Sequence, residues 1–383
     1  MKCIQCNVDN NLKDRTANQG RCSNCKHPFA FEPTTMKAKL RFTDGFFAKA
    51  LADISANGTL YFTRKQLLYL LEKRLLRKAR IALAVLLAGL LFILAILVGM
   101  SILVSNRLGW IVPIFMIVCA VGFIFLVQRF ERRFLRPKKI NKSVLITDAM
   151  LDLWLQQWQR FNPHPARLLP PPSAPASLAP AADDDVTTYS FDRVLVCDSV
   201  AIAQLLIANN IHFEHNCAVL SISGYPQAIF ATTMAMLRRN PDLQVIALHN
   251  CSPSGVALIN QLRTSPDWSL DSTQVIFDLG MLPRQIAAAR DQAYIQVSAN
   301  SAQNAREMPL EVSKQLTAME LKWLDAGYFV DLESFTPKKL MQIVSYGITK
   351  LQNLGEDVDE NLILVSDLGG GNSTFIYASD NFG

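Results

Sequence analysis

The sequence predicts a multidomain protein with three parts: a small N-terminal metal-binding module, a hairpin of two transmembrane helices, and a C-terminal α/β domain whose sheet is mostly parallel. Three observations predict this fold class. Two Cys-x2-Cys pairs open the chain, two long uncharged apolar runs occupy its middle, and short apolar strands alternate with helical segments in its second half.

The N-terminal module is predicted from four cysteines in two close pairs, Cys3 with Cys6 and Cys22 with Cys25, with fifteen residues between the pairs. Two such pairs can place four thiolates tetrahedrally around one Zn²⁺. The second turn, residues 21–29, resembles the knuckles of zinc-ribbon proteins. This resemblance implies a structural zinc in residues 1–34 and a surface that binds nucleic acid or protein.

The transmembrane hairpin is predicted from residues 81–104 and 110–127, two runs without a charged side chain in either. A helix needs about 20 apolar residues to cross a bilayer. We expect residues 35–80 to form a juxtamembrane helical region and residues 128–161 a basic juxtamembrane helix. The alternative for the two runs is a helical hairpin buried in a soluble core.

Charge predicts the orientation of this hairpin. Residues 64–80 contain seven Lys or Arg and one Glu, and residues 129–142 contain the same numbers, whereas the connecting loop contains only Arg107. Cationic flanks stay on the cytoplasmic side. We therefore expect two spans in the inner membrane, both termini in the cytoplasm, and the lipid bilayer as a partner.

Composition divides the chain at a linker. Residues 162–186 are rich in Pro and Ala, which predicts an extended spacer. Residues 1–186 contain 26 Lys and Arg against 12 Asp and Glu, and residues 187–383 contain 12 against 20. A broad DNA-binding surface needs a basic face, so the acidic second half argues against one there.

Residues 187–383 are predicted to form the α/β domain. Near-continuous apolar strands joined by helical crossovers are typical of a parallel sheet covered on both faces. Ligands bind such sheets at the carboxyl ends of the strands. We expect strands at 193–198, 217–223, 244–249, 274–278 and 361–366, and helices at 199–209, 226–239, 252–263, 312–326 and 336–354.

Within this domain, residues 190–285 resemble the Toprim domain of topoisomerases, primases and related nucleases. Asp198 follows the first strand, Gly224 the second, and Asn250-Cys-Ser-Pro-Ser-Gly255 the third. The family has carboxylates that hold Mg²⁺ in the third motif, and here Asn250 and Ser252 stand in their places. The resemblance implies a Toprim-like (Rossmann-like) fold in which the metal site is lost.

Two further features are candidates for chemistry. His249, near Asp278 or Cys251, could act in acid/base catalysis, although a polar residue capping the helix that starts near Ser252 is the more frequent explanation. Ser252, Ser254 and Gly255 could bind an anion at a helix N-terminus. The ligand-binding candidates are therefore Gly224, Asn250, Ser252, Ser254 and Gly255.

Three functions remain open, one of which is a membrane-associated nucleic-acid binder that acts through the ribbon and the basic flanks; the other two are as follows. The first is a membrane-anchored cytoplasmic scaffold or sensor, without enzymatic activity, that binds protein, nucleotide or nucleic acid through the ribbon and the Toprim-like domain. The alternative is a Mg-dependent nuclease or phosphotransferase that uses Asp198 and Asp278, with His249 assisting.

Overall fold

The computed structural model describes residues 1–37, 40–76, 89, 146–172, 191–268, 270, 274–288 and 294–353, together with the backbone of 362–366 and 374–378. The chain divides into two compact units. The first consists of residues 1–32, 42–70 and 139–383, and the second of residues 33–41 and 71–138. All of the sites discussed below lie in the first unit.

Residues 1–32, the ribbon module, contain two similar turns, one around each cysteine pair. In each turn the residue after the second cysteine has a φ of 59°, at Asn7 and at Lys26. Antiparallel bridges close the two turns, Lys2 with Asp9 and Arg21 with Pro28. Between the turns lies α1 (Leu12–Ala17), which begins with a capping box. The repeated Cys-x2-Cys pattern therefore folds twice into the same local structure.

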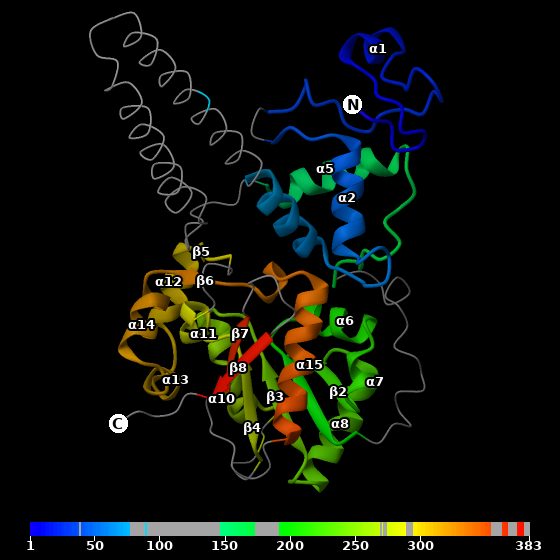
Figure 1. Cartoon of the computed structure of the whole chain (residues 1–383). Coiled ribbons are helices and arrows are strands. Elements are labelled where there is room, and N and C mark those ends of the chain that lie inside the picture. The colour runs from blue at the N-terminus through cyan, green and yellow to red at the C-terminus, as the bar shows by residue number, and fades with distance from the viewer. Residues whose placement is uncertain are drawn as a thin grey trace, which may run out of the picture. The chain divides into compact units, whose positions relative to one another are not determined.

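A helical layer follows the ribbon module (Figure 1). It contains α2 (Asp44–Ile54), a helix that begins at Arg64, and α5 (Asp148–Gln159). Thr43 caps α2 and Thr147 caps α5, each through a side-chain oxygen that accepts a backbone N–H. These polar residues stand just before apolar helical stripes, so local sequence determines where both helices begin.

Aromatic rings join this layer to the ribbon module. The ring of Phe31 lies 4.7 Å from that of Phe42 and 5.1 Å from that of Phe47, measured between centroids. Trp154 packs edge-on against Phe42 at 4.8 Å, and Trp158 lies 5.2 Å from Phe47. Aromatic pairs at these separations stabilise by about 1 kcal/mol beyond the burial of their area. Phe31 therefore anchors the end of the ribbon module in the helical layer.

The α/β domain contains a four-stranded parallel sheet of order β2-β1-β3-β4. Its strands are β1 (Arg193–Cys197), β2 (Cys217–Ser221), β3 (Gln244–Leu248) and β4 (Ile276–Gly280). Its helices are α6 (Val200–Ala208), α7 (Ile211–Glu214), α8 (Gln227–Arg239), α9 (Pro253–Val256), α10 (Leu258–Thr264), α11 (Pro283–Ala288) and α15 (Pro337–Asn353). The predicted parallel sheet is confirmed.

The two faces of the sheet are covered by different helices (Figure 1). Leu195 and Ile246 face a core shared with α6, α7 and α15. Val194 and Val245, their neighbours along the strands, face a core shared with α8 and α10. Because successive side chains point to opposite faces, strands that are apolar throughout are buried on both sides.

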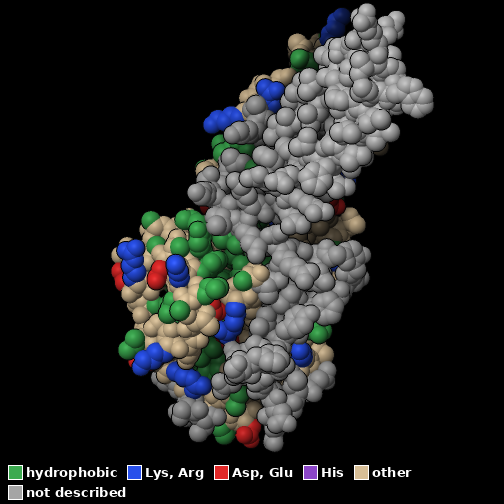
Figure 2. All heavy atoms as spheres, turned by 60° about the vertical axis from the view of Figure 1, so that its left-hand side comes forward, with side chains coloured by type: hydrophobic (Ala, Val, Ile, Leu, Met, Phe, Trp, Pro, Cys, Tyr) green, Lys and Arg blue, Asp and Glu red, His purple; other side chains and the backbone are tan. Residues whose placement is uncertain are grey.

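Smaller elements lie beside this sheet. They are α12 (Ala299–Arg306), α13 (Leu310–Lys314), α14 (Ala318–Asp325), the 3₁₀ turn η5 (Leu332–Ser334) and two antiparallel pairs, β5 (Gln296–Val297) with β6 (Tyr328–Phe329) and β7 (Leu362–Ser366) with β8 (Thr374–Ala378). Figure 2 shows hydrophobic side chains among charged ones on the face that includes α12–α14.

The prediction of a transmembrane hairpin is wrong. Among the described residues, no helix has both the length and the apolar composition that a bilayer crossing requires. Even α15, with 17 residues, carries Lys338, Lys339 and Lys350. The spans predicted at 81–104 and 110–127 lie outside the described residues apart from Gly89. The fold class is thereby corrected to a cysteine-rich module, a helical layer and an α/β domain, and the inner-membrane location predicted from the hairpin is not supported.

Candidate functional site

The four N-terminal cysteines form a candidate metal centre. The sulfur atoms of Cys3 and Cys25 lie 3.6 Å apart, and those of Cys6 and Cys22 lie 3.5 Å apart. All four sulfur atoms lie within 4.8 Å of one another. A zinc ion bound tetrahedrally at about 2.3 Å from each sulfur requires separations of about 3.8 Å. The four ligands predicted from spacing are therefore close enough together to hold one metal ion.

Neighbouring groups stabilise the thiolate of Cys22 at this centre. Burial alone would raise the pKa of Cys22, but backbone N–H groups of Cys25 and Asn24 and the amide of Asn10 lower this pKa to about 6. The Asn10 Nδ2 atom lies 3.5 Å from the sulfur of Cys22, and its Oδ1 accepts from the N–H of Ser23 at 2.8 Å. Asn10 thus links the first turn to the second through hydrogen bonds to both.

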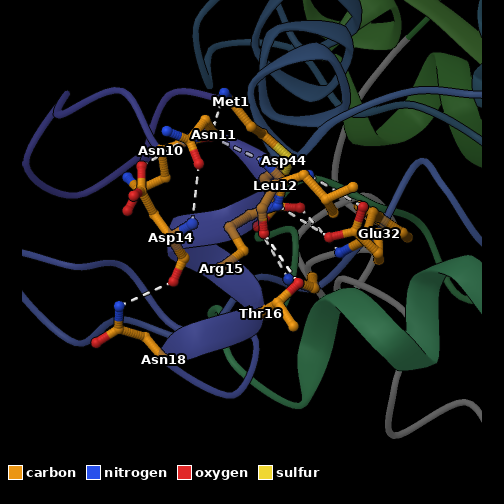
Figure 3. A network of polar contacts seen from close by, with 12 residues as sticks. Met1, Asn10, Asn11, Leu12, Asp14, Arg15, Thr16, Asn18, Glu32 and Asp44 are labelled. Carbon is orange, nitrogen blue, oxygen red and sulfur yellow. Dashed lines mark hydrogen bonds and ion pairs between the residues drawn. The ribbon is translucent and has the colours of Figure 1, made fainter.

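A polar network holds the ribbon module in shape (Figure 3). Arg15 donates to both carboxylate oxygens of Glu32, at 2.9 and 3.1 Å, and to the backbone carbonyl of Asn10 at 2.8 Å. Asp44, which is fully buried in α2, accepts from the N–H groups of Ala30 and Phe31 at 2.9 Å each. The end of the ribbon module is therefore bonded to the helical layer as well as packed against it.

A second candidate site lies at the carboxyl edge of the parallel sheet. The strand order places the topological switch point between β1 and β3, and Asp198 and Asn250 follow these two strands. The N–H of Asn250 donates to Asp198 Oδ2 at 2.8 Å, and the N–H of Leu332 donates to Asn250 Oδ1 at 2.7 Å. Burial raises the pKa of Asp198, although the bond from Asn250 opposes this shift. Gly224, after β2, lies in a tight turn with a φ of +79°.

His249, which is fully buried, pairs with Asp278, whose side chain is 18% exposed, between β3 and β4. His249 Nε2 lies 3.0 Å from Asp278 Oδ1, and His249 Nδ1 lies 2.8 Å from the carbonyl oxygen of Asn250. Two acceptors require both ring nitrogens to carry hydrogen, which is the charged form of histidine. Burial alone would lower the pKa of His249, but the charge of Asp278 raises it above its usual value. The same interaction outweighs burial at Asp278 and lowers the pKa of that carboxyl.

Ser252, Ser254 and Gly255 lie at the start of α9, a helix of four residues. Ser252 Oγ accepts from the N–H of Gly255 at 3.1 Å and lies 3.2 Å from Ser254 Oγ. At the predicted anion-binding site, the Ser252 hydroxyl therefore already accepts a hydrogen bond from the start of α9. Anion binding there stays a prediction.

Replacement of Gly255 by Ala is expected to destabilise the protein by about 3 kcal/mol, because an added Cβ would lie 2.1 Å from the carbonyl oxygen of Asn250. Gly45→Ala in α2 is the matched control, since a Cβ there meets no atom within 4 Å and Ala favours helix by about 1 kcal/mol. Chemical denaturation measures both changes. Equal stability of the two variants would contradict the steric role of Gly255.

The sequence did not reveal a polar cluster that joins the helical layer to this edge of the sheet. Lys65 pairs with Asp331 at 2.9 Å, and Tyr69 donates to the same carboxylate. Thr63 donates to Glu333 at 2.7 Å. These partners are more than 260 residues apart in sequence, and charged residues at such separations carry no local pattern that predicts pairing. The one local signal is the Thr63–Gln66 cap, in which each side chain bonds the backbone of the other residue.

Comparisons with known protein families and with curated proteins found no match. No model of a known protein family matches the chain, and no curated protein matches it. The Toprim resemblance therefore rests on the residues quoted above, and the zinc-ribbon resemblance rests on those residues and on the closeness of the four cysteines.

Proposed function

We propose that this protein is a scaffold without enzymatic activity, in which a structural zinc ion holds the ribbon module in shape and the ribbon module binds a protein partner. The observation that carries the proposal is the closed arrangement of the four cysteines. Four sulfur ligands fill the coordination sphere of zinc, whereas catalytic zinc sites keep a position for water or substrate. A metal in this centre contributes folding energy to a module too small for a large core.

The polar groups at the carboxyl edge support a structural role. His249 is fully buried and both of its nitrogens have acceptors within the protein. Asn250 uses its N–H, its backbone carbonyl and its side-chain oxygen in internal bonds. A catalytic acid or base must reach the proton that it transfers, within about 3 Å or through one water molecule. These groups instead hold the loops after β3 and β4 in place.

The exposed surface of the ribbon module supports a protein partner. Val8 and Leu12 are large apolar side chains that stand exposed, and Leu12 is 51% exposed. Lys13 lies beside Leu12, whereas Arg15 is buried and paired with Glu32. Nucleic-acid contacts are dominated by cations that face phosphate. Lys2, Arg21 and Lys26 are also exposed on the module, so the preference for a protein partner rests on the exposed apolar side chains of Val8 and Leu12.

Replacement of Leu12 by Glu is expected to weaken partner binding by about 30-fold, because a charge in an interface core costs about 2 kcal/mol. The measurement is quantitative affinity purification of the full chain from its host, followed by titration of the enriched protein. Leu310→Glu on α13 is the matched control, since Leu310 is 64% exposed and lies in the α/β domain. A partner that is retained by Leu12→Glu, or lost equally from both variants, would contradict binding through the ribbon module.

The competing proposal is a Toprim-like nuclease or phosphotransferase that uses Mg²⁺. It is favoured by Asp198, whose Oδ1 is buried and has no hydrogen-bond partner among the described residues. Against it, the only group of three or more His, Cys, Asp or Glu side chains close enough to hold a metal, within the described ranges, is the four cysteines. Mg²⁺-dependent cleavage of DNA, RNA or nucleotide by the full chain, lost in Asp198→Ala, would replace the scaffold proposal with this one.

A further inference from the structure

A cavity of about 380 Å³ opens where the start of the Arg64 helix meets α6 and η5. Its polar lining is Thr63, Arg64, Lys65, Asp148, Gln204 and Glu333. Leu169, Ala201 and three consecutive prolines, residues 170–172, form an apolar wall. Ligand pockets of about 300–1,000 Å³ with mostly apolar walls and a few polar groups are typical of small-molecule sites.

Two polar groups of this lining, Gln204 and Asp148, make no hydrogen bond to a residue that the structure describes. Gln204 is only 6% exposed, and its amide makes no hydrogen bond to any residue that the structure describes. The carboxylate of Asp148 is exposed and likewise makes no hydrogen bond or close ion pair within the described part of the chain, although its charge acts on Lys65. A ligand that supplies a cationic donor and a hydrogen-bonding group would satisfy both.

The cations of the lining determine which further charged group the ligand carries. Lys65 Nζ lies 2.9 Å from Asp331 and 3.8 Å from Glu333, and Arg64 pairs with Asp152. An ammonium group has three N–H donors, so Lys65 retains capacity for a further acceptor. The carboxylates of Asp148 and Glu333 would repel a polyphosphate, and the cations of Lys65 and Arg64 would repel a polyamine. The balanced charge favours a ligand that carries one group of each sign.

We infer that this cavity binds a free α-amino acid, with the ligand's ammonium group at Asp148, its carboxylate at Lys65 and Gln204, and its side chain against the proline wall. The inference uses no residue of the ribbon module, so its test is independent of the proposed partner surface.

Isothermal titration of the full chain with each of the twenty amino acids tests the site. At least one is expected to bind, and its N-acetylated and its C-amidated derivatives are expected to bind at least tenfold more weakly, because each lacks one charged group. Gln204→Leu and Asp148→Asn are expected to weaken binding by at least tenfold, whereas Asp325→Asn, an exposed carboxylate on α14, is expected to leave it unchanged.

Gln204→Leu keeps the volume of the side chain and removes only its amide, so it separates recognition from folding. Thermal unfolding of each variant verifies that it folds. The inference is overturned if no amino acid binds at 10 mM (on the order of the weakest affinities of small-molecule sites), if the variants bind as tightly as the original chain, or if a nucleotide or polyamine binds through Gln204 and Asp148 instead.

Discussion

Removal of the metal by a chelator, or replacement of Cys22 by Ser, is expected to unfold residues 1–32 and to leave the parallel sheet folded. Structural zinc in small modules contributes about 10–16 kcal/mol of apparent binding energy at pH 7. The ribbon module has few other stabilising contacts, because its buried residues are mainly Cys3, Cys22, Asn10, Arg15 and Phe31. The sheet has its own cores on both faces, which contain no residue of the ribbon module.

Hydrogen exchange of backbone amides measures this result directly. Protection is expected to be lost in the two cysteine turns and in α1 and to persist in β1 and β3. Cys217→Ser, which changes a buried cysteine of β2, is the matched control and is expected to leave exchange in residues 1–32 unchanged. Full protection of residues 1–32 after complete chelation would show that the metal does not hold the module together.

Replacement of Asp278 by Asn is expected to destabilise the protein by about 3–5 kcal/mol, because the buried His249 must then either stay charged without its partner or lose its proton. The pair also predicts how stability depends on pH. The folded-state pKa of His249 is raised, so its contribution is fully present below the unfolded value of about 6.5 and is lost as pH rises through the folded value. The pKa of Asp278 is lowered, so its contribution is present above about 3.9 and is lost as pH falls through the folded value.

In the Asp278→Asn variant, the effect of pH on the free energy of unfolding is expected to change sign near neutral pH. Without Asp278, burial dominates and lowers the pKa of His249, so the free energy of unfolding increases as pH rises from about 6 to 8. In the original chain the contribution of the pair decreases over the same range. Urea titrations at several pH values, with Asp325→Asn as control, measure the difference. Parallel pH profiles of the original chain and Asp278→Asn would contradict the charged pair.

Much of the fold could be predicted because its signals are local. The apolar strands of the α/β domain, with crossover helices between them, predict β1–β4 within two residues at each end. The predicted helix at 252–263 is divided in the structure into α9 and α10, which meet at Ala257. The cysteine pairs predicted the metal centre, since both pairs form turns of the same geometry.

The parts that could not be predicted depend on contacts between distant residues. Nothing near Tyr69 in the sequence indicates that its hydroxyl bonds to Asp331, or that Gln296 donates to that hydroxyl at 2.7 Å. Leu169 was assigned to a linker from its proline-rich surroundings, yet it is buried in the core on the α6 side of the sheet. The hairpin prediction used hydropathy and flanking charge alone, and no described helix supports it.

X-ray absorption at the zinc edge of the purified full chain tests the central claim most directly, because the scaffold proposal depends on a closed metal centre. The account predicts one zinc ion per chain with four sulfur neighbours at about 2.3 Å and no nitrogen or oxygen neighbour. A chain without bound zinc, or a zinc ion with an oxygen ligand in an open position, would contradict it.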